Sequence, residues 1–259
     1  MTEFSMIGKE IIIDDLKIHY YQGDNFDKNN TIAFLHGWNS EALHLKAIFS
    51  ELDNFIALDL PGFGKSDLPR TAWAVAEYAE LLQKFLKKLE MVDPILVGHS
   101  FGGSVIIKYL FNGGAAKKII LVSPSGIRKQ GLKIGLYKVI AKIMRVALMF
   151  PGLSFFKDKI RKKAYKIIDS EDYIEAGALS ESYKKIIRED LSEEMQKIRT
   201  KTVLIWGERD LSTPLVQGEL THKLIENSEL YIIKNAGHFS FIDQPAEFKK
   251  IFSREIDAT

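Results

Sequence analysis

The stretch Pro94-Ile95-Leu96-Val97-Gly98-His99-Ser100-Phe101-Gly102 decides the fold of this chain. Its apolar part is typical of a buried strand, its last five residues have the pattern Gly-x-Ser-x-Gly, and a helix-like sequence follows from residue 103 to residue 110. An abrupt strand-to-helix turn strains the backbone of the serine, and glycines at positions 98 and 102 remove the collisions that larger side chains would make there. The pattern predicts a nucleophile elbow, in which Ser100 is raised above the sheet beside the free N–H groups that begin the helix.

Suitable partners for this serine follow later in the chain. Asp210 comes after the apolar run 203–206 and His238 comes after the run 230–234, so the order is Ser, Asp, His. Taken alone, Asp210 is typical of a turn cap before Pro214, and His238 is compatible with a buried polar side chain. Considered together, the three residues favour nucleophilic catalysis, in which the histidine removes the serine proton and the carboxylate orients the imidazole ring.

Composition limits the class of protein. The chain has 259 residues, of which 46% are hydrophobic and 27% are charged, as is typical of a soluble globular protein with a sizeable core. The absence of cysteine excludes disulfides, thiolate metal sites and cysteine nucleophiles, and it fits a reducing compartment. The first six residues, MTEFSM, lack the basic segment and apolar core of a signal peptide, which predicts a cytoplasmic protein. A net charge of +2 gives no reason to expect a nucleic-acid partner.

Short β-type runs alternate with helical patterns along most of the chain. Such alternation predicts right-handed crossovers and a mainly parallel sheet, so the expected fold class is α/β. Expected strands lie at 10–13, 17–22, 31–35, 55–60, 95–99, 118–123, 203–206 and 230–234. Expected helices lie at 41–52, 74–90, 103–111, 214–227 and 245–256.

The alternation is interrupted at residues 125–200, where helical periodicity continues without a convincing strand. We interpret this segment as a helical lid inserted into the core. Basic residues dominate from 128 to 166, and on a helix Lys138, Lys142 and Arg145 would form a basic stripe beside a wide apolar face. Two interpretations stay open: a cap helix that packs on the core or on its acidic neighbour 169–194, and a surface that makes weak contact with membrane lipid or closes over an acyl chain.

Several motifs agree in their order along the chain and in their positions after strands. They are His36-Gly37-Trp38, Asp59-Leu60-Pro61-Gly62-Phe63-Gly64-Lys65-Ser66, the pentapeptide 98–102, Trp206-Gly207-Glu208-Arg209-Asp210 and Ala236-Gly237-His238. With these motifs the chain resembles the α/β-hydrolase fold superfamily over nearly its full length. The resemblance implies an α/β-hydrolase fold: a mostly parallel central sheet flanked by helices forms the core from residues 1–124 and 201–259, and residues 125–200 form an inserted helical lid, or cap.

The resemblance also implies a role for individual residues. Ser100 is the expected nucleophile, His238 the general base, and Asp210 the carboxylate that fixes the imidazole tautomer. The backbone N–H groups of Trp38 and Phe101 are expected to form the oxyanion hole, which stabilises the negative charge of the tetrahedral intermediate. The side chains expected to line the substrate site are those of Trp38, Phe101 and Phe239.

Other polar motifs near these residues are expected to be structural. His36 and His99 are interpreted as hydrogen-bonding groups near the site. The glycine-rich loop 61–64 after Asp59 is interpreted as a turn beside the pocket, because the lysine and the helix N-terminus of a phosphate-binding loop are not in their required positions. No spacing of His, Asp or Glu indicates a metal site and no fingerprint indicates a nucleotide, so neither a metal nor a cofactor is expected.

The serine at position 100 narrows the reaction. Superfamily members that hydrolyse epoxides or carbon–halogen bonds carry an aspartate there, so the resemblance implies hydrolysis of a carboxylic ester or thioester, of a small or acyl-chain substrate, through an acyl-enzyme. Three alternatives stay open. One is hydrolysis of a carbon–carbon bond, which is disfavoured because Phe239 follows the histidine where such relatives usually carry tryptophan. Another is cofactor-free perhydrolysis or acyl transfer to an acceptor other than water. The third is a ligand-binding receptor with little turnover. The oligomeric state is left open.

Overall fold

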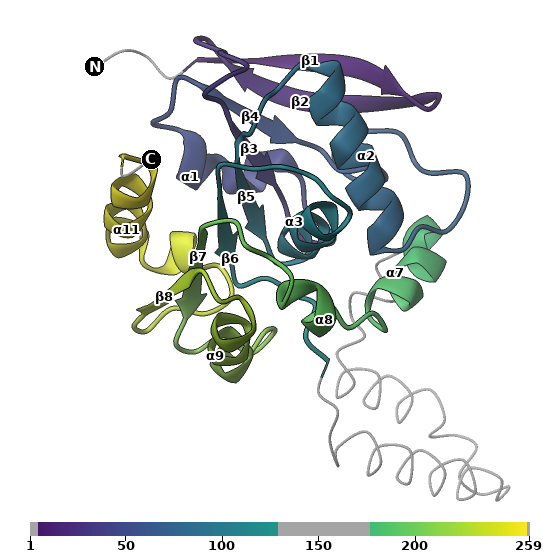
Figure 1. The fold of residues 1–259 in the computed structure, drawn as a ribbon. Coiled ribbons are helices and arrows are strands. Elements are labelled where there is room, and N and C mark those ends of the chain that lie inside the picture. Colours follow the sequence, from purple (N-terminus) through teal and green to yellow (C-terminus); the bar gives the residue numbers. More distant parts are fainter. Residues whose placement is uncertain (1–4, 129–176, 258–259) are drawn as a thin grey trace, which may run out of the picture.

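The computed structural model describes residues 5–128 and 177–257, and its centre is an eight-stranded sheet (Figure 1). The strand order is β1-β2-β4-β3-β5-β6-β7-β8. β2 pairs antiparallel with β1 and with β4, whereas the remaining pairs are parallel, which confirms the predicted α/β fold with a mostly parallel sheet. The eight strands, β1 to β8, are Met6–Ile13, Leu16–Gly23, Ile32–Leu35, Phe55–Leu58, Ile95–His99, Lys118–Val122, Thr202–Gly207 and Ser228–Ile233.

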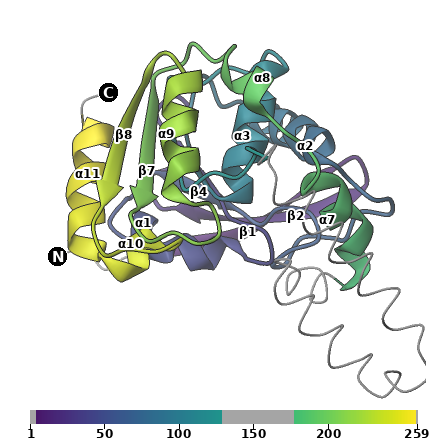
Figure 2. The same cartoon turned by 90° about the horizontal axis from the view of Figure 1, so that it is seen from below.

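Helices cover both faces of this sheet (Figure 2). One face carries α2 (Val75–Lys88), α3 (Phe101–Phe111), α8 (Ser192–Met195) and α9 (Leu215–Leu224). The other face carries α1 (Lys46–Phe49), α10 (Ser240–Asp243) and α11 (Pro245–Asp257). The helix α7 (Ser180–Ile186), preceded by the 3₁₀ turn η3 (Gly177–Leu179), lies beyond the end of α2 (Figure 1).

The two layers of helices explain why the inner strands are buried and mostly apolar. On β3, Ala33 and Leu35 join the core under α2 and α3, whereas Ile32 and Phe34 join the core under α1 and α11. Successive strand residues point to opposite faces, so a strand covered on both sides reads as a continuous apolar run. The carboxyl ends of the parallel strands meet at one edge of the sheet, which is where a fold of this kind places its ligand site.

The stretch expected as one helix at residues 41–52 is instead two short elements. A 3₁₀ turn, η1 (Ala42–Leu45), leads into the single-turn helix α1. The buried side chains of η1, Ala42 and Leu45, are three residues apart, which matches the three-residue turn of a 3₁₀ helix, and those of α1 are Ile48 and Phe49. The expected helix 41–52 is therefore wrong in its length and regularity, because its first turn is a 3₁₀ turn.

Only part of the segment expected as a lid, 125–200, falls within the described residues. Residues 129–176, which include the basic stripe and its interpretation as a lipid-contacting surface, lie outside them. The arm at 177–200 packs on the main body, since Leu191 and Met195 are both fully buried in the same apolar core as α3. None of the described helices is long and apolar enough to cross a membrane.

Candidate active site

Ser100 occupies the turn between β5 and α3, in a backbone conformation with a φ of 50°. This left-handed conformation is unfavourable for a side-chain-bearing residue and is characteristic of strained functional turns. Close packing on both sides requires the two glycines. A Cβ atom at Gly98 would lie 2.7 Å from the backbone of Gly102, and one at Gly102 would lie 2.3 Å from the carbonyl oxygen of Leu35. The predicted elbow is therefore present, and its glycines are needed because strands and helix approach here without room for a methyl group.

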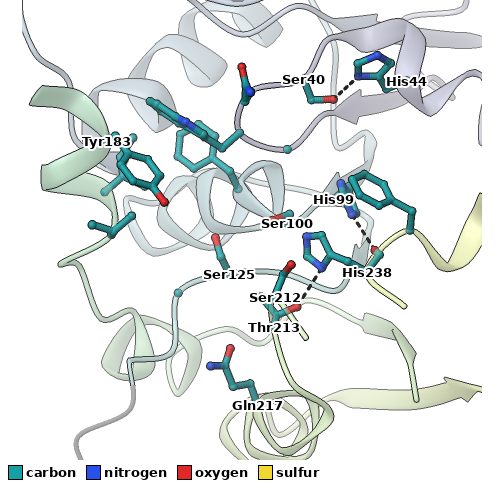
Figure 3. Close-up of a pocket in the computed structure, with 18 of the residues that line it drawn as sticks. Ser40, His44, His99, Ser100, Ser125, Tyr183, Ser212, Thr213, Gln217 and His238 are labelled. Carbon is teal, nitrogen blue, oxygen red and sulfur yellow. Dashed lines mark hydrogen bonds between the residues drawn. The ribbon is translucent and has the colours of Figure 1, made fainter. Parts of the chain in front are cut away.

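A pocket of about 580 Å³ opens over this turn (Figure 3). It brings together Ser100 with residues that are far from it in the sequence, among them Trp38 and His238. Every residue expected at the site lines this pocket except Asp210, which is 3% exposed and contacts the histidine. The site residues that line it are Trp38, Ser100, Phe101, His238 and Phe239.

His238 and Asp210 form a direct hydrogen-bonded pair. The Nδ1 atom of His238 lies 2.8 Å from Oδ2 of Asp210, and the carboxylate side chain is completely buried. The backbone N–H groups of Ser212 and Thr213 both donate to Oδ1 of Asp210, each at 2.9 Å. Asp210 is thus both the turn cap that its sequence position indicates and the carboxylate partner of His238.

The environment of Asp210 favours its ionised form. Burial acts to raise the pKa of this carboxyl group, but the hydrogen bond and charge of His238, the N–H of Thr213 and the hydroxyl of Ser123 act to lower it, and the net shift of the pKa is downward. The Ser123 hydroxyl is buried and its geometry falls short of a hydrogen bond to any described residue, so its effect is that of a nearby dipole. A carboxylate kept ionised in this way can orient a histidine that donates from Nδ1.

Two backbone N–H groups border the pocket beside Ser100. Phe101 is the first residue of α3, and helix geometry leaves its N–H without an intrahelical partner. Trp38 follows Gly37, whose position is so close to the elbow that a Cβ atom there would lie 3.3 Å from Cβ of Ser100. Among the described residues, neither the N–H of Trp38 nor that of Phe101 makes a backbone hydrogen bond outside regular elements. Both groups are therefore available to a ligand in the pocket.

The aromatic side chains expected at the substrate site differ in their accessibility. Phe101 is buried and packs edge-on against the ring of Trp38, with 5.6 Å between the ring centroids. Trp38 also lies against Tyr183 of α7, at 5.3 Å between ring centroids. Phe239 is 45% exposed and packs against the ring of His99. Trp38 and Phe239 thus offer apolar surface to a ligand, whereas the buried ring of Phe101 mainly packs against the ring of Trp38.

His36 and His99 are structural, as their motif positions indicated. His36 donates from Nδ1 to the carbonyl of Gly37 at 2.7 Å and accepts at Nε2 from the N–H of Leu60 at 3.0 Å. His99 donates from Nε2 to the carbonyl of His238 at 3.0 Å and so holds the loop that carries the candidate base. Burial lowers the pKa of His36 to about 4 and that of His99 to about 3, so both are neutral near pH 7.

The glycine-rich loop after β4 is likewise a structural turn. The buried carboxylate of Asp59 accepts hydrogen bonds from the N–H groups of Ala42 and Lys65 and contacts Nδ1 of His19 at 2.8 Å. A Cβ atom on Gly64, which has a φ of +54°, would overlap this carboxylate. The loop places Phe63 against the Trp38 ring, with 4.9 Å between centroids, and in this way shapes the pocket wall.

The pocket also contains polar residues that sequence reasoning did not select. Ser125 lies just beyond β6 and Thr213 lies in the turn of Asp210, so their positions at the carboxyl ends of strands could have indicated them. Tyr183 on α7 carried no comparable signal. In the part of the chain that the structure describes, no three His, Asp or Glu side chains gather in a way that could hold a metal ion. The arrangement provides a hydroxyl, a carboxylate-paired imidazole and free N–H donors, which are the groups that acyl transfer requires.

The chain is similar to several known proteins over most of its length. A family model described as "Alpha/beta hydrolase family" matches residues 32–251, a range that includes Ser100, Asp210 and His238. The uncharacterized hydrolase YugF of Bacillus subtilis is 27% identical over 261 residues, which cover 92% of this chain and 93% of that protein. The solved structure of a thermophilic esterase is 27% identical, with a TM-score of 0.71 and 98% of both chains covered. A 2-hydroxy-6-oxononadienedioate/2-hydroxy-6-oxononatrienedioate hydrolase of Pseudomonas putida is 22% identical over 265 residues, which cover 92% of this chain and 90% of that protein.

Proposed function

The chain belongs to the alpha/beta hydrolase family, and from this we propose that it is a serine hydrolase that cleaves carboxylic esters or thioesters of a small or acyl-chain substrate. The observation that carries the proposal is the 2.8 Å hydrogen bond between His238 and Asp210 at a pocket that Ser100 lines from a strained turn. The likeness to a thermophilic esterase, at 27% identity over nearly the whole chain, supports an ester as the substrate.

In the proposed mechanism, Ser100 attacks the carbonyl carbon of the substrate. His238 takes the hydroxyl proton at Nε2 while its Nδ1–H stays hydrogen-bonded to Asp210, so the imidazolium that forms is stabilised by a buried carboxylate. The tetrahedral intermediate then expels the alcohol or thiol, which receives the proton from His238. A water molecule, deprotonated by the same imidazole, hydrolyses the acyl-enzyme and returns Ser100 to its starting state.

The N–H groups of Trp38 and Phe101 are proposed to stabilise the oxyanion. Both border the pocket beside Ser100, and neither is used in a backbone hydrogen bond outside regular elements of the described chain. Main-chain donors of this kind are fixed before the substrate binds, so they require little reorganisation when negative charge develops on the carbonyl oxygen. Replacement of the Trp38 side chain is therefore expected to change substrate preference more than the chemical step.

A second candidate is hydrolysis of a carbon–carbon bond. It is supported by the likeness to the Pseudomonas putida hydrolase over 92% of this chain, at 22% identity. A serine, histidine and aspartate arranged as here could serve either reaction, because both release an acyl group to water. The residue after the candidate base is Phe239, where the resemblance to that class led us to expect tryptophan, and we therefore rank ester hydrolysis first.

The test is hydrolysis of p-nitrophenyl esters, from acetate to long acyl chains, by the wild type and by folded Ser100→Ala. We expect the substitution to lower kcat by at least ~1,000-fold and Asp210→Asn to lower it about 10,000-fold, because the first removes the nucleophile and the second inverts the histidine tautomer. Ser253→Ala, on the exposed side of α11, is the matched control and should keep full activity. The acyl length preferred by the wild type measures the reach of the pocket.

Each outcome separates the candidates. Equal turnover by the wild type and Ser100→Ala would contradict a serine mechanism. If the wild type turns over no ester, the carbon–carbon candidate is tested next by following the absorbance of a vinylogous diketone substrate. Binding of such a compound without its decay would point to a receptor.

The remaining predictions concern the whole chain. The division into a core, 1–124 and 201–259, and an inserted cap, 125–200, stays a prediction that is supported by the pocket-lining positions of Tyr183, Ile186 and Ile187. A small ester as the partner, weak lipid contact through the basic segment, and a cytoplasmic location also stay predictions.

A further inference from the structure

The side chain of Thr213 lies where the candidate base and its carboxylate meet. Its hydroxyl oxygen is 3.0 Å from Oδ2 of Asp210 and 3.3 Å from the carbonyl oxygen of Ser123. It is also 3.4 Å from Nδ1 of His238, and Figure 3 shows this contact as a dashed line. The residue is 6% exposed, so bulk water does not compete for these contacts. One hydroxyl therefore faces two acceptors and one N–H donor at hydrogen-bond range.

This hydroxyl completes the hydrogen bonding of the carboxylate. Oδ1 of Asp210 accepts two backbone N–H groups, from Ser212 and Thr213, while Oδ2 accepts from His238 and from the Thr213 hydroxyl. An ionised carboxylate offers about four lone-pair positions, and all four are filled by these donors. A carboxylate bonded in this way cannot rotate about its Cβ–Cγ bond without breaking a hydrogen bond, so its Oδ2 stays aimed at Nδ1 of His238.

The main chain of Thr213 is anchored separately from its side chain. The indole N–H of Trp206 donates to the carbonyl of Thr213 at 2.7 Å, and the Thr213 N–H is held by Asp210. These two bonds need only the backbone at position 213, so they persist whatever the side chain. The hydroxyl is therefore not required to hold the turn, and its placement against the His238–Asp210 pair calls for a separate role.

We propose that Thr213 is a positioning residue of the Ser100, His238 and Asp210 set, and that its hydroxyl has two working arrangements. In the first, it donates to Asp210 and fixes the carboxylate. In the second, it donates to the Ser123 carbonyl and accepts the Nδ1–H of His238, so that the imidazole keeps its tautomer even when its bond to Asp210 lengthens. The change between them is a rotation of the hydroxyl hydrogen, and no proton is transferred. The inference rests on the proposed function.

In the first arrangement, the Thr213 hydroxyl affects how kcat/KM depends on pH. A hydroxyl that donates to Asp210 stabilises the pair most when His238 is neutral and the carboxylate charge is uncompensated, so it lowers the apparent pKa at which the pair takes up a proton. Loss of the hydroxyl should therefore move the acid limb of the kcat/KM profile to higher pH. The variants at position 213 leave the other ionisable or charged groups around the pair unchanged. These groups are His99 on β5, His44 and Arg128 at the pocket wall, and Asp243 on α10, which accepts the Gly237 N–H.

The experiment compares Thr213→Val with Thr213→Ser, because valine keeps the shape without the hydroxyl and serine keeps the hydroxyl without the methyl group. With the best ester of the series, Thr213→Val should lower kcat about tenfold with little change in KM, and should raise the apparent pKa of the acid limb by roughly half to one unit. Thr213→Ser should show the same apparent pKa for the acid limb of the kcat/KM profile as the wild type. The matched control is Thr202→Val at the start of β7, where the hydroxyl donates to the carbonyl of Thr200, away from the pocket.

A second comparison tests the acceptor arrangement. In an Asp210→Ala background, the Thr213 hydroxyl is, within residues 5–128 and 177–257, the acceptor that still faces Nδ1 of His238, so adding Thr213→Val should lower the residual rate of Ser100 acylation about tenfold again. No further loss would overturn the second arrangement. If Thr213→Val does not fold, Thr213→Ala takes its place against Thr213→Ser.

The outcomes distinguish this inference from the proposed function beneath it. Ester turnover that is abolished by Ser100→Ala but unchanged in kcat and pH profile by Thr213→Val would overturn the role of Thr213 alone. Equal losses in Thr213→Val and Thr213→Ser would also overturn it, because they would indicate packing of the methyl group. Turnover that does not depend on Ser100 would overturn the proposed function instead.

Discussion

At the scale of single residues, the site depends on the absence of a side chain at Gly102 as much as on the side chain of Ser100. Ser100 holds a φ of 50° because β5 enters α3 without a loop, and Gly102 allows the start of that helix to touch the end of β3. A methyl group at this point meets a backbone carbonyl, which cannot swing aside as a flexible side chain can. The backbone of the elbow is thus set by its neighbours on the sheet.

Gly102→Ala should therefore damage both stability and activity. Its Cβ would lie 2.3 Å from the Leu35 oxygen, and we expect the free energy of unfolding to fall by about 3 kcal/mol and ester turnover to fall at least ~100-fold as the elbow shifts. The measurements are urea unfolding and kcat on the preferred ester. Gly113→Ala is the control: with a φ of +88° and nothing within 4 Å, it should cost only about 1 kcal/mol and leave turnover intact. A fully active and stable Gly102→Ala would contradict the packing argument.

At the scale of elements, the arm at 177–200 connects the pocket wall to the core. The Arg128 guanidinium donates to the carbonyl oxygens of Ile186, the last residue of α7, and of Glu189, and the Leu191 N–H donates to the carbonyl of Gly126. Lys108 of α3 forms ion pairs with Glu189 and Glu194, at 3.1 and 2.6 Å. The arm is therefore attached to the body between residues 186 and 194, and it carries Tyr183 to the pocket at a fixed place.

The helix α8 provides the apolar part of this attachment. Met195 is fully buried within the core that also contains α3, so Met195→Ala should leave a cavity and lower the free energy of unfolding by about 2–5 kcal/mol. Because the arm holds Tyr183 against Trp38, the KM for the preferred ester should rise as well. Urea unfolding and steady-state kinetics test both effects, with the exposed Glu193→Ala as the control. Wild-type stability in Met195→Ala would show that the arm is not part of the cooperative core.

At the scale of the whole molecule, buried histidines couple folding to pH. Burial lowers the pKa of His36 to about 4 and that of His99 to about 3, whereas both titrate near pH 6.5 in an unfolded chain. Between these values the unfolded state binds more protons than the folded state, so stability is complete above about pH 6.5 and is lost as the pH falls. The lowered pKa of Asp210 acts in the same direction at more acidic pH.

The free energy of unfolding should therefore fall by about 4 kcal/mol between pH 7 and pH 5, at a limiting slope of about 1.4 kcal/mol per pH unit for each buried histidine. Urea titrations at several pH values measure this slope. His99→Gln should remove about half of it, whereas His222→Gln, at an exposed position on α9, should leave it unchanged. Stability that is flat from pH 7 to pH 5 would show that the two histidines are protonated in the folded protein.

The sheet and the elbow could be predicted from the sequence alone. The inner strands are buried on both faces, so most of their residues are apolar, and the elbow is a local turn whose two glycines, Gly98 and Gly102, lie close together in the chain. The order of Ser100, Asp210 and His238 along the chain was equally readable, because each follows a strand whose end lies at the same edge of the sheet.

How these residues are held depends on the tertiary structure. The hydrogen bond between His238 and Asp210, the contact of Thr213 with His238, and the burial of α8 each join residues that lie far apart in the sequence. The break between η1 and α1 also depends on tertiary packing, because the sequence of this stretch predicts one continuous helix. Periodicity and turn chemistry are properties of neighbours in the chain, whereas hydrogen-bond partners and packing depend on which distant surfaces meet when the sheet is assembled.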